Sequence, residues 1–376
     1  MSELEYTEHG FRQTLDPYRH HRSKRWDYKG AGIYHITMTV AEHFPLFGEL
    51  VGDTPDEARI ALNAFGKRIN WLVRDLPSFY VPKGIDIKIL AVQVMPDHIH
   101  VVLQVLRAMP RPVGEIVRSF KSAATAIYKR EYLNAANGGN NAAKDNDSAR
   151  QQNPPQAVVA FARIFASISS LWQPIPAGYH DCFLHERGQL RRMIDYVHDN
   201  PRRLALKRAN PDLFRIHQQT SVAGVTCTTL GNMFLAEMPQ RAVLQCSRSL
   251  TPPDIAQKRA ECLLEASNGT VYVTAAISEG EKTIARALRE AGYPLIILLE
   301  NGFPQPDDPH YAFYKPQGLY FEACAKAQLL LVEPSDELLN RPDIAAKVTT
   351  QAGDIPHTTQ RYRFLALNAI AEQIAS

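Results

Sequence analysis

The chain has 376 residues, more than one hydrophobic core usually serves, so two domains are expected. Apolar residues make up 45% and charged residues 22%, which is ordinary for a globular protein, and no apolar run reaches the roughly 18 residues of a membrane helix. The N-terminus has no apolar signal core, and the five cysteines show no Cys-x-x-Cys spacing. The sequence therefore predicts a soluble, cytoplasmic protein with no membrane partner.

Charge is distributed unevenly along the chain. Residues 1–220 contain 29 Lys and Arg against 22 Asp and Glu, a net charge of +7, whereas residues 221–376 contain 13 against 17, a net charge of −4. A basic first half favours a polyanionic partner such as nucleic acid, although a basic surface also serves solubility. Charge alone leaves both interpretations open.

The first half alternates between strand and helix patterns. Residues 32–40 have the β-branched alternation of a strand, and residues 54–76 have helical spacing behind an N-terminal Thr-Pro cap. Residues 86–95 and 98–105 read as two strands joined by a short turn, and residues 112–133 as a second helix. This order is typical of the opening of a ferredoxin-like sheet.

A polar segment then interrupts the pattern. An insertion at about 134–158, rich in Asn, Gly, Ala and Gln, has no apolar periodicity and predicts a flexible loop or linker. A helix follows from about Gly188 and is expected to stop near Asn200-Pro201.

The second half has the pattern of alternating strands and helices that is typical of a parallel sheet. Residues 268–303 parse as strand, helix, strand, and Ser278 with Glu281 forms a capping box at the helix start. Residues 327–334 add a strand, and a final helix ends the chain. The predicted fold class is therefore α+β: a ferredoxin-like domain over residues 1–220, followed by a Rossmann-like α/β domain over residues 221–376.

Two histidines stand one residue apart in the strand 98–105. Successive side chains of a strand alternate between faces, so His98 and His100 project from the same side and could share a metal ion. A chain with 13 histidines also produces such a pair by chance. A metal site therefore needs a further ligand and a nucleophile from elsewhere.

Tyr196 and Asn200 supply candidates for both roles. They are four residues apart and so face the same way on a helix. A tyrosine hydroxyl can attack a phosphodiester when a divalent cation stabilises charge on the phosphate. Two imidazoles and an amide oxygen leave coordination positions open for substrate, as a catalytic site needs.

Three segments carry a specific resemblance: "MPDHIHVVL", "SFKSAATAIYK" and "LWQPIPAGYHDCFLHERGQLRRMIDYVHDNPRR". Over residues 18–207 the chain resembles the REP-associated tyrosine transposases of the HUH superfamily. The resemblance implies a domain that binds single-stranded DNA folded into hairpins and cleaves it with one tyrosine, which keeps the 5′ phosphate. It implies Tyr196 as the catalytic nucleophile, with His98, His100 and Asn200 as ligands of Mg²⁺ or Mn²⁺.

Basic side chains on two helices are candidate DNA contacts, with an ordinary solvated face as the other interpretation. They are Arg118, Lys121, Lys129, Arg130, Arg202 and Arg203. The insertion is longer than the family's, and "GYHDCFLHE" matches the family pattern only loosely. The roles of His180, Asp181 and His185 therefore stay open between substrate or metal contact and structural hydrogen bonding. A homodimer is a further possibility.

The C-terminal part resembles Rossmann-like domains of the DNA-processing protein A type, through "TAAISEGEKTIARALREAGYPLIILLENGF" and "YKPQGLYFEACAKAQLLLVEP". Ser278 and Gly280, with the backbone N–H groups of Ala276 and Ile277, could hold an anion at the helix N-terminus. The other interpretation is that Ser278 only caps the helix. No Gly-x-Gly-x-x-Gly or Walker signature supports a nucleotide cofactor.

The first functional hypothesis is a metal-dependent, single-strand DNA endonuclease and strand transferase. The alternative is a hairpin-DNA-binding regulator with little or no cleavage activity. An ordinary His-x-His metallohydrolase ranks last, because Asp97 is expected on the strand face opposite both histidines.

Overall fold

The computed structural model describes residues 4–7, 10–13, 27–133, 171–172, 180–184, 188–299, 303 and 318–376. The chain divides into two compact units: Pro17–Leu206, and Lys207–Ser376 together with Met1–Asp16. In the latter segment, β1 (Leu4–Thr7) pairs with β2 (Gly10–Gln13). None of the described helices is long and apolar enough to cross a membrane.

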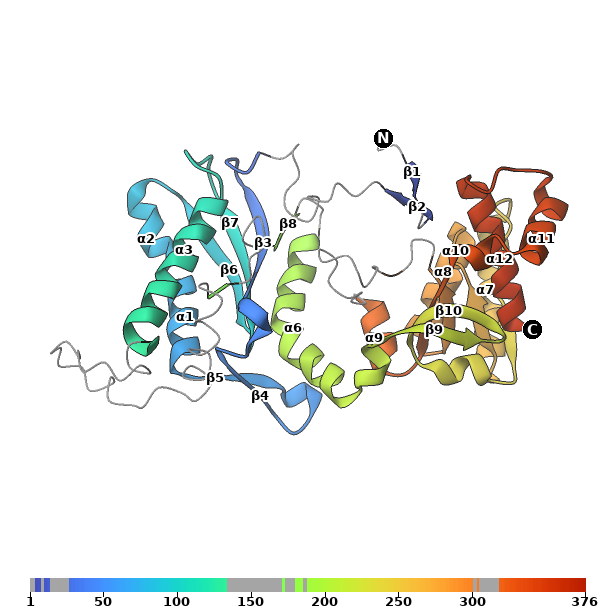
Figure 1. Ribbon diagram of the computed structural model, residues 1–376, viewed down its shortest axis with the longest axis horizontal. Helices are drawn as coiled ribbons and strands as arrows, with labels where there is room; N and C mark the ends of the chain where they lie inside the picture. The colour runs from blue at the N-terminus through green and yellow to red at the C-terminus, as the bar shows by residue number, and fades with distance from the viewer. Residues whose placement is uncertain are drawn as a thin grey trace. The chain divides into compact units, whose positions relative to one another are not determined.

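A four-stranded antiparallel sheet is the centre of the first unit. Its strands are β3 (Gly32–Thr39), β6 (Ile87–Val94), β7 (His98–Val105) and β8 (His180–Leu184), in the order β6-β7-β3-β8. Helices α1 (Ala64–Arg74), α2 (Leu76–Tyr80) and α3 (Gly114–Ile127) lie on one side of it, and α6 (Gln189–Ala209) lies on the other (Figure 1). The order of strand, helix, hairpin and helix agrees with the prediction from sequence.

Alternation along the strands separates two faces of this sheet. Ile36 on β3 and Ile99 and Val101 on β7 belong to the main core beneath α1 and α3. Residues of the opposite parity face α6, where Val102 and Val197 belong to a smaller apolar cluster. His35, His98 and His100 share the parity of this second face.

The helix predicted over residues 54–76 is wrong in its first half. Arg59–Leu62 forms β5, which pairs with β4 (Gly48–Val51), because exposed and half-buried residues alternate there as in a half-buried strand. Helix α1 begins only at Ala64, where Asn63 caps it by accepting a 2.9 Å hydrogen bond from the backbone N–H of Gly66.

The predicted end of α6 near Asn200-Pro201 is also wrong, since the helix continues to Ala209. Pro201 has no N–H to donate to the carbonyl of Val197. The Asn200 side-chain amide donates instead, to the carbonyl of Tyr196 at 2.8 Å and to that of Val197 at 3.4 Å. These bonds compensate for the missing donor and let the helix pass through the proline.

The second unit is built on a six-stranded sheet with the order β11-β12-β13-β14-β10-β9. Its strands are β9 (Ile216–Val222), β10 (Val225–Gly231), β11 (Arg241–Val243), β12 (Val271–Thr274), β13 (Leu295–Leu298) and β14 (Leu329–Pro334). The four strands from β11 to β14 are parallel, whereas β10 pairs antiparallel with both β14 and β9. The parallel βαβ unit predicted over residues 268–303 is therefore present.

Helices cover both faces of this sheet. They are α7 (Pro252–Ser267), α8 (Glu279–Glu290) and α9 (Leu319–Ala325) on one face, and α10 (Asp336–Leu339), α11 (Pro342–Ala352) and α12 (Gln360–Ala375) on the other. Val271 and Val273 pack in the core with α12, while Tyr272 between them packs in the core with α7 and α8.

The boundary between the units lies at Leu206/Lys207 rather than at the predicted 220/221. Strand β9 begins at Ile216 and pairs with β10, so the second sheet takes up residues that the sequence pattern left in the first domain. The insertion at about 134–158 lies outside the described residues.

Candidate functional site

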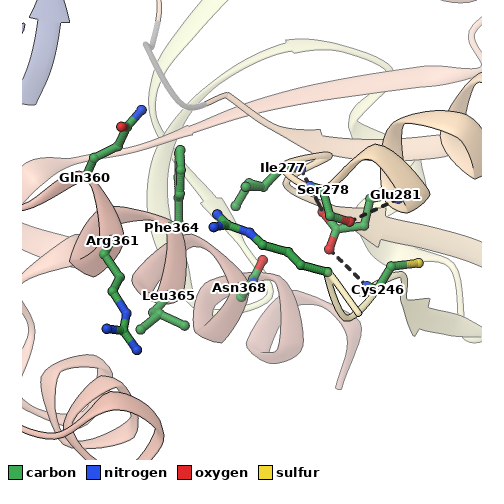
Figure 2. A pocket seen from close by; sticks show the side chains of 10 residues that line it. Cys246, Ile277, Ser278, Glu281, Gln360, Arg361, Phe364, Leu365 and Asn368 are labelled. Carbon is green, nitrogen blue, oxygen red and sulfur yellow. Dashed lines mark hydrogen bonds between the residues drawn. The ribbon is translucent and has the colours of Figure 1, made fainter. Parts of the chain in front are cut away.

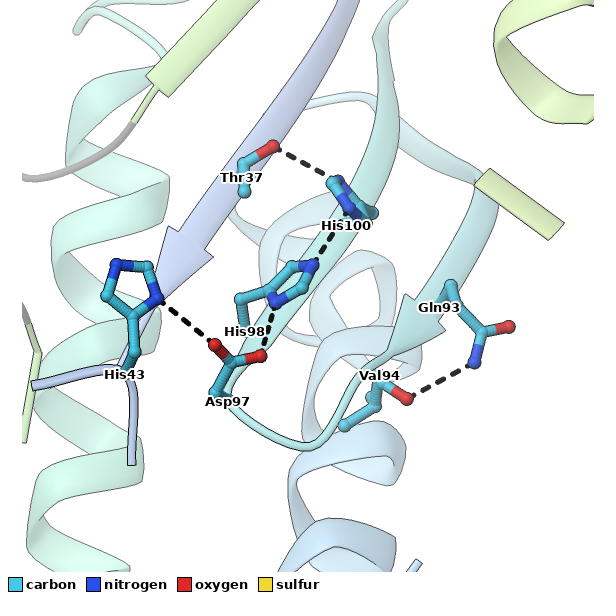
Figure 3. A network of polar contacts seen from close by, with 7 residues as sticks. All are labelled: Thr37, His43, Gln93, Val94, Asp97, His98 and His100. Atoms are coloured by element: carbon cyan, nitrogen blue, oxygen red, sulfur yellow. Dashed lines mark hydrogen bonds and ion pairs between the residues drawn. The ribbon is translucent and has the colours of Figure 1, made fainter. Parts of the chain in front are cut away.

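The histidine pair lies on β7, on the face of the sheet that α6 covers. His98 is the first residue of the strand, and His100 stands opposite Thr37 of β3 and Gln93 of β6 in the strand register. His100 is buried, while the His98 side chain keeps 25% exposure. The pair is therefore held on rigid backbone with one member reachable from solvent (Figure 3).

Asp97 holds the outer nitrogen of His98. Its carboxylate accepts a 2.6 Å hydrogen bond from His98 Nδ1, and its second oxygen lies 3.1 Å from His43 Nδ1. The expectation that Asp97 points away from the histidines is wrong, because Asp97 lies in the turn before β7 and not in the strand. Burial acts to raise the pKa of Asp97, but hydrogen bonds and charge from His98 and His43 outweigh it and lower that pKa.

Two side chains of β3 contact the His100 ring. Its Nδ1 lies 3.1 Å from His35 Nε2 and 3.1 Å from Thr37 Oγ1. Burial lowers the pKa of His35 to about 4, so this imidazole is neutral at physiological pH. His35 and Thr37 thus fix the ring orientation of His100.

The Nε2 atoms of His98 and His100, which are the inner nitrogens of the pair, point toward each other. His98 Nε2 and His100 Nε2 are 3.1 Å apart, and the rings are almost perpendicular. Because His98 donates a hydrogen bond from Nδ1 to Asp97, the Nε2 atom of the neutral ring has a lone pair. His100 Nε2 can donate a hydrogen bond to it at this 3.1 Å distance, and the two nitrogens can instead bind one cation, because ligand atoms about 2.1 Å from an octahedral cation stand roughly 3 Å apart. The donor set therefore fits a shared divalent cation.

Carboxylate-to-histidine contacts of this kind accompany metal-ligating histidines, because they fix the tautomer and raise ligand basicity. Within the described ranges, however, no group of three or more His, Cys, Asp or Glu side chains is arranged to hold a metal ion. A cation at the pair would need amide or substrate oxygens to complete its coordination.

Tyr196 of α6 lies over the histidines. Its ring centroid is 5.7 Å from that of His100 and 6.0 Å from that of His35. The Arg203 guanidinium lies 5.3 Å from the centre of the Tyr196 ring. Burial raises the pKa of Tyr196, and the charge of Arg203 and a hydrogen bond with Asn200 act against that rise.

Asn200 is buried one turn after Tyr196, as the helical spacing predicts. Its amide nitrogen donates to the backbone carbonyls of Tyr196 and Val197. The amide oxygen is therefore the side-chain atom that could bind a metal ion. No hydrogen bond joins Asn200 to His98 or His100 in the described part of the chain. Its role as third ligand stays a prediction.

The candidate DNA contacts fall on opposite faces of the sheet. Arg202 and Arg203 lie on α6, both near Asp199, at 2.8 and 4.0 Å. The other four belong to α3 and to the π-helical segment Tyr128–Leu133 that follows it, on the face away from the histidines; they are Arg118, Lys121, Lys129 and Arg130.

Neighbouring side chains also contact Arg118, Lys121 and Arg130. Arg118 pairs with Glu115 at 2.7 Å and Arg130 with Glu131 at 2.5 Å. Burial lowers the pKa of Lys121 to about 8, and its ammonium lies 5.3 Å from the centre of the Trp172 ring. The structure does not bring them together with Tyr196.

Sequence reasoning missed His35, Thr37 and His43. The strand alternation contains the signal for the first two, because both share the parity that faces α6 and pair across from β7. His180 stands opposite Thr37 in the register of β8, while the side chains of His180 and Asp181, and His185 entirely, lie outside the described residues.

The predicted anion site at the start of α8 is occupied by the protein itself. The capping box is confirmed, with Ser278 Oγ accepting from the Glu281 N–H. The buried Glu281 carboxylate accepts hydrogen bonds from the backbone N–H groups of Ile277 at 2.7 Å, Ser278 at 3.2 Å and Cys246 at 3.0 Å. Those donors are therefore not free to bind a phosphate.

Gly280 has a packing role in the same turn. A Cβ added there would lie 3.1 Å from Cys246 Cβ and 3.3 Å from Cys246 Sγ. The glycine allows α8 to approach the segment after β11 closely, which is why a small residue is needed there.

Comparisons with known proteins find distant similarities. No protein-family model matches the chain. A protein of Haemophilus influenzae described as uncharacterised is 26% identical over 131 residues, which cover 28% of this chain and 68% of that protein.

Among solved structures, 48% of this chain is similar to 96% of a candidate transposase from Deinococcus radiodurans, with a TM-score of 0.23 and 16% identity. The same share of the chain is similar to 72% of a REP-associated tyrosine transposase bound to a REP hairpin, with a TM-score of 0.21 and 13% identity.

Proposed function

We propose that the first unit is a ferredoxin-like, metal-dependent DNA strand transferase that cleaves single-stranded DNA through Tyr196. The observation that carries the proposal is that His98 Nε2 and His100 Nε2 lie 3.1 Å apart, while the Tyr196 ring centroid lies 5.7 Å from that of His100. Both outer nitrogens are held by neighbouring side chains, so the inner nitrogens are oriented before any ligand binds.

His98 and His100 would hold Mg²⁺ or Mn²⁺, with the Asn200 oxygen as third ligand. A divalent cation bound there would stabilise negative charge on a substrate phosphate. As the tyrosine oxygen bonds to phosphorus, the hydroxyl loses its proton and the bond to the 3′ oxygen breaks. The 3′ oxygen takes up a proton, and the 5′ phosphate stays on Tyr196.

Two arginines support this chemistry. Arg203 lies near the Tyr196 ring, and its positive charge favours the phenolate that forms during attack. Arg202 lies one residue before it on α6 and is half-buried beside Asp199. We propose both as phosphate contacts, with hairpin-containing single-stranded DNA as the substrate class that the sequence resemblance implies.

The metal part of this proposal is tested by titrating the full chain with Mn²⁺ in a calorimeter. His98→Ala and His100→Ala should each abolish measurable binding, because each removes half of the imidazole pair. His217→Ala is the matched control, since that half-buried histidine lies in the second unit. Unchanged Mn²⁺ affinity in the His98 and His100 variants would contradict the metal site.

A further inference from the structure

A second candidate site is formed entirely within the second unit, by residues other than those proposed for strand transfer. A cavity of about 460 Å³ opens outside the carboxyl ends of β11 and β12. Its wall comprises Cys246 and Arg248 after β11, Ile277, Ser278 and Glu281 after β12, and Gln360, Arg361, Phe364, Leu365 and Asn368 from α12. The carboxyl ends of parallel strands are the usual position of ligand sites in α/β sheets, and the volume is in the range of small-molecule pockets.

Two cations in this pocket are uncompensated. Arg248 and Arg361 both line it, and neither forms a hydrogen bond or ion pair with any residue in the described ranges. The Glu281 carboxylate also lines the pocket, but three backbone N–H groups surround it. The pocket therefore favours an anionic group on its ligand.

One buried acceptor in the wall is unsatisfied. Asn368 Oδ1 is inaccessible to solvent and has no hydrogen-bond partner within the described part of the protein. Leaving such an atom unpaired costs free energy, so structures usually supply it with a donor. Asn368 lines the cavity, so rotation of its side-chain amide would bring this oxygen to a ligand N–H or O–H group.

Other residues of the pocket wall provide an apolar surface and a hydroxyl hydrogen-bond donor. Figure 2 shows Phe364 and Asn368 coming from α12, with Ser278 and Glu281 at the start of α8 across from them. Phe364 and Leu365 are half-buried and can contact a flat apolar group. Ser278 Oγ already accepts a hydrogen bond from Glu281, so its hydroxyl proton can be donated into the pocket.

We propose that this pocket binds a small organic phosphate that combines a flat ring with a hydrogen-bond donor, of which a nucleoside monophosphate is the simplest form. The phosphate contacts Arg248, with Arg361 as a second cation, and the ring lies against Phe364. A ring amino or sugar hydroxyl group donates to Asn368 Oδ1. Glu281 excludes the phosphate from the helix start, so the anion contacts the guanidinium groups instead.

The test is calorimetric titration of the full chain with AMP, GMP, CMP and UMP, and with adenosine and inorganic phosphate as fragments. At least one nucleotide should bind tenfold or more tightly than either fragment, because only the nucleotide satisfies both ends of the pocket. No binding by any nucleotide, or binding no tighter than that of phosphate, would overturn the proposal.

Charge variants locate the site. Arg248→Gln should weaken nucleotide binding about tenfold or more, since it removes a charge-assisted hydrogen bond, and Arg361→Gln should weaken it less. Arg259→Gln is the matched control, because this exposed arginine lies on α7 outside the pocket. Equal behaviour of the Arg248 and Arg259 variants would place the ligand elsewhere.

Asn368→Leu separates a ligand role from a structural one. It removes the unsatisfied oxygen with little change of volume, so the melting temperature of the free protein should not fall while nucleotide affinity does. A fall in melting temperature with unchanged affinity would contradict the role of Asn368. If an oligonucleotide without terminal phosphate depends on Arg248 and no nucleotide does, the pocket belongs to a DNA-binding surface and the proposal is wrong.

Discussion

At the scale of single residues, the candidate site is a chain of hydrogen bonds in which the Nε2 atoms of His98 and His100 face each other at 3.1 Å. Asp97 orients His98 from one side, and His35 and Thr37 orient His100 from the other. Holding ligands in position before the cation binds lowers the cost of ordering them afterwards. The outer residues should therefore affect metal affinity although none of them is a predicted ligand.

Asp97→Asn tests this positioning role. The variant keeps the shape of the side chain but loses the charge that fixes the His98 tautomer, so Mn²⁺ affinity should fall about 10- to 100-fold. Calorimetric titration measures it, and DNA cleavage should recover at high Mn²⁺ concentration.

Asp86→Asn is the control for this substitution. Asp86 has the same 25% side-chain exposure as Asp97 and pairs with Arg107 instead of a histidine. If both variants bind Mn²⁺ like the wild type, Asp97 does not position the site.

At the scale of elements, α6 connects the tyrosine to the sheet. Its apolar residue Val197 packs against Val102 of β7, which places Tyr196 above the histidines. Where the helix passes Pro201, the Asn200 amide bonds to two carbonyls of the preceding turn. Asn200 thus has a structural role in addition to its proposed metal contact.

Asn200→Asp separates these two roles. A carboxylate retains an oxygen for the cation but has no donor for the carbonyls of Tyr196 and Val197, so the variant should lose about 1–3 kcal/mol of unfolding free energy. Its Mn²⁺ affinity should stay within a few-fold of the wild type. Urea unfolding and calorimetry measure the two effects, and unchanged stability would contradict the structural role.

The sequence predicted the structure best where a segment followed a single periodicity, either strand alternation or helical spacing. The strands of the first sheet, the capping box at Ser278 and the face shared by His98 and His100 follow from local alternation or spacing. The pattern failed at residues 54–62, where strand pairing with β4 outweighed a plausible helix cap, and at Pro201, where a side chain replaced the missing backbone donor.

Other features required tertiary structure. The contact of Asp97 with His98 depends on the turn geometry, and the approach of His35 to His100 depends on the pairing of β3 with β7. Glu281 was identified as a cap, but its bond to Cys246 joins segments 35 residues apart and excludes an external anion. No local spacing predicts such a bond.

At the scale of the whole molecule, the chain combines two units with separate cores and opposite charge. The basic part of the sequence contains the histidines and Tyr196, and the acidic part contains the pocket beside α12. Every residue proposed for strand transfer precedes Lys207, where the second unit resumes.

A shortened chain of residues 17–209 should therefore fold, bind Mn²⁺ and form a covalent DNA adduct. It contains the complete four-stranded sheet and all of α6. Adduct yield on a hairpin oligonucleotide, compared with the full chain, measures the result. A folded, soluble fragment that binds Mn²⁺ but forms no adduct would show that the second unit is required for the reaction.

The most direct measurement is the covalent adduct itself. The full chain is incubated with Mn²⁺ and a labelled single-stranded oligonucleotide that contains a hairpin, and the adduct is resolved on a denaturing gel. The wild type and the control Tyr80→Phe should both form it, whereas Tyr196→Phe should form none while binding the DNA within a few-fold, because only the hydroxyl attacks phosphorus. Adduct formation by Tyr196→Phe, or its absence in the wild type, would contradict the proposed function.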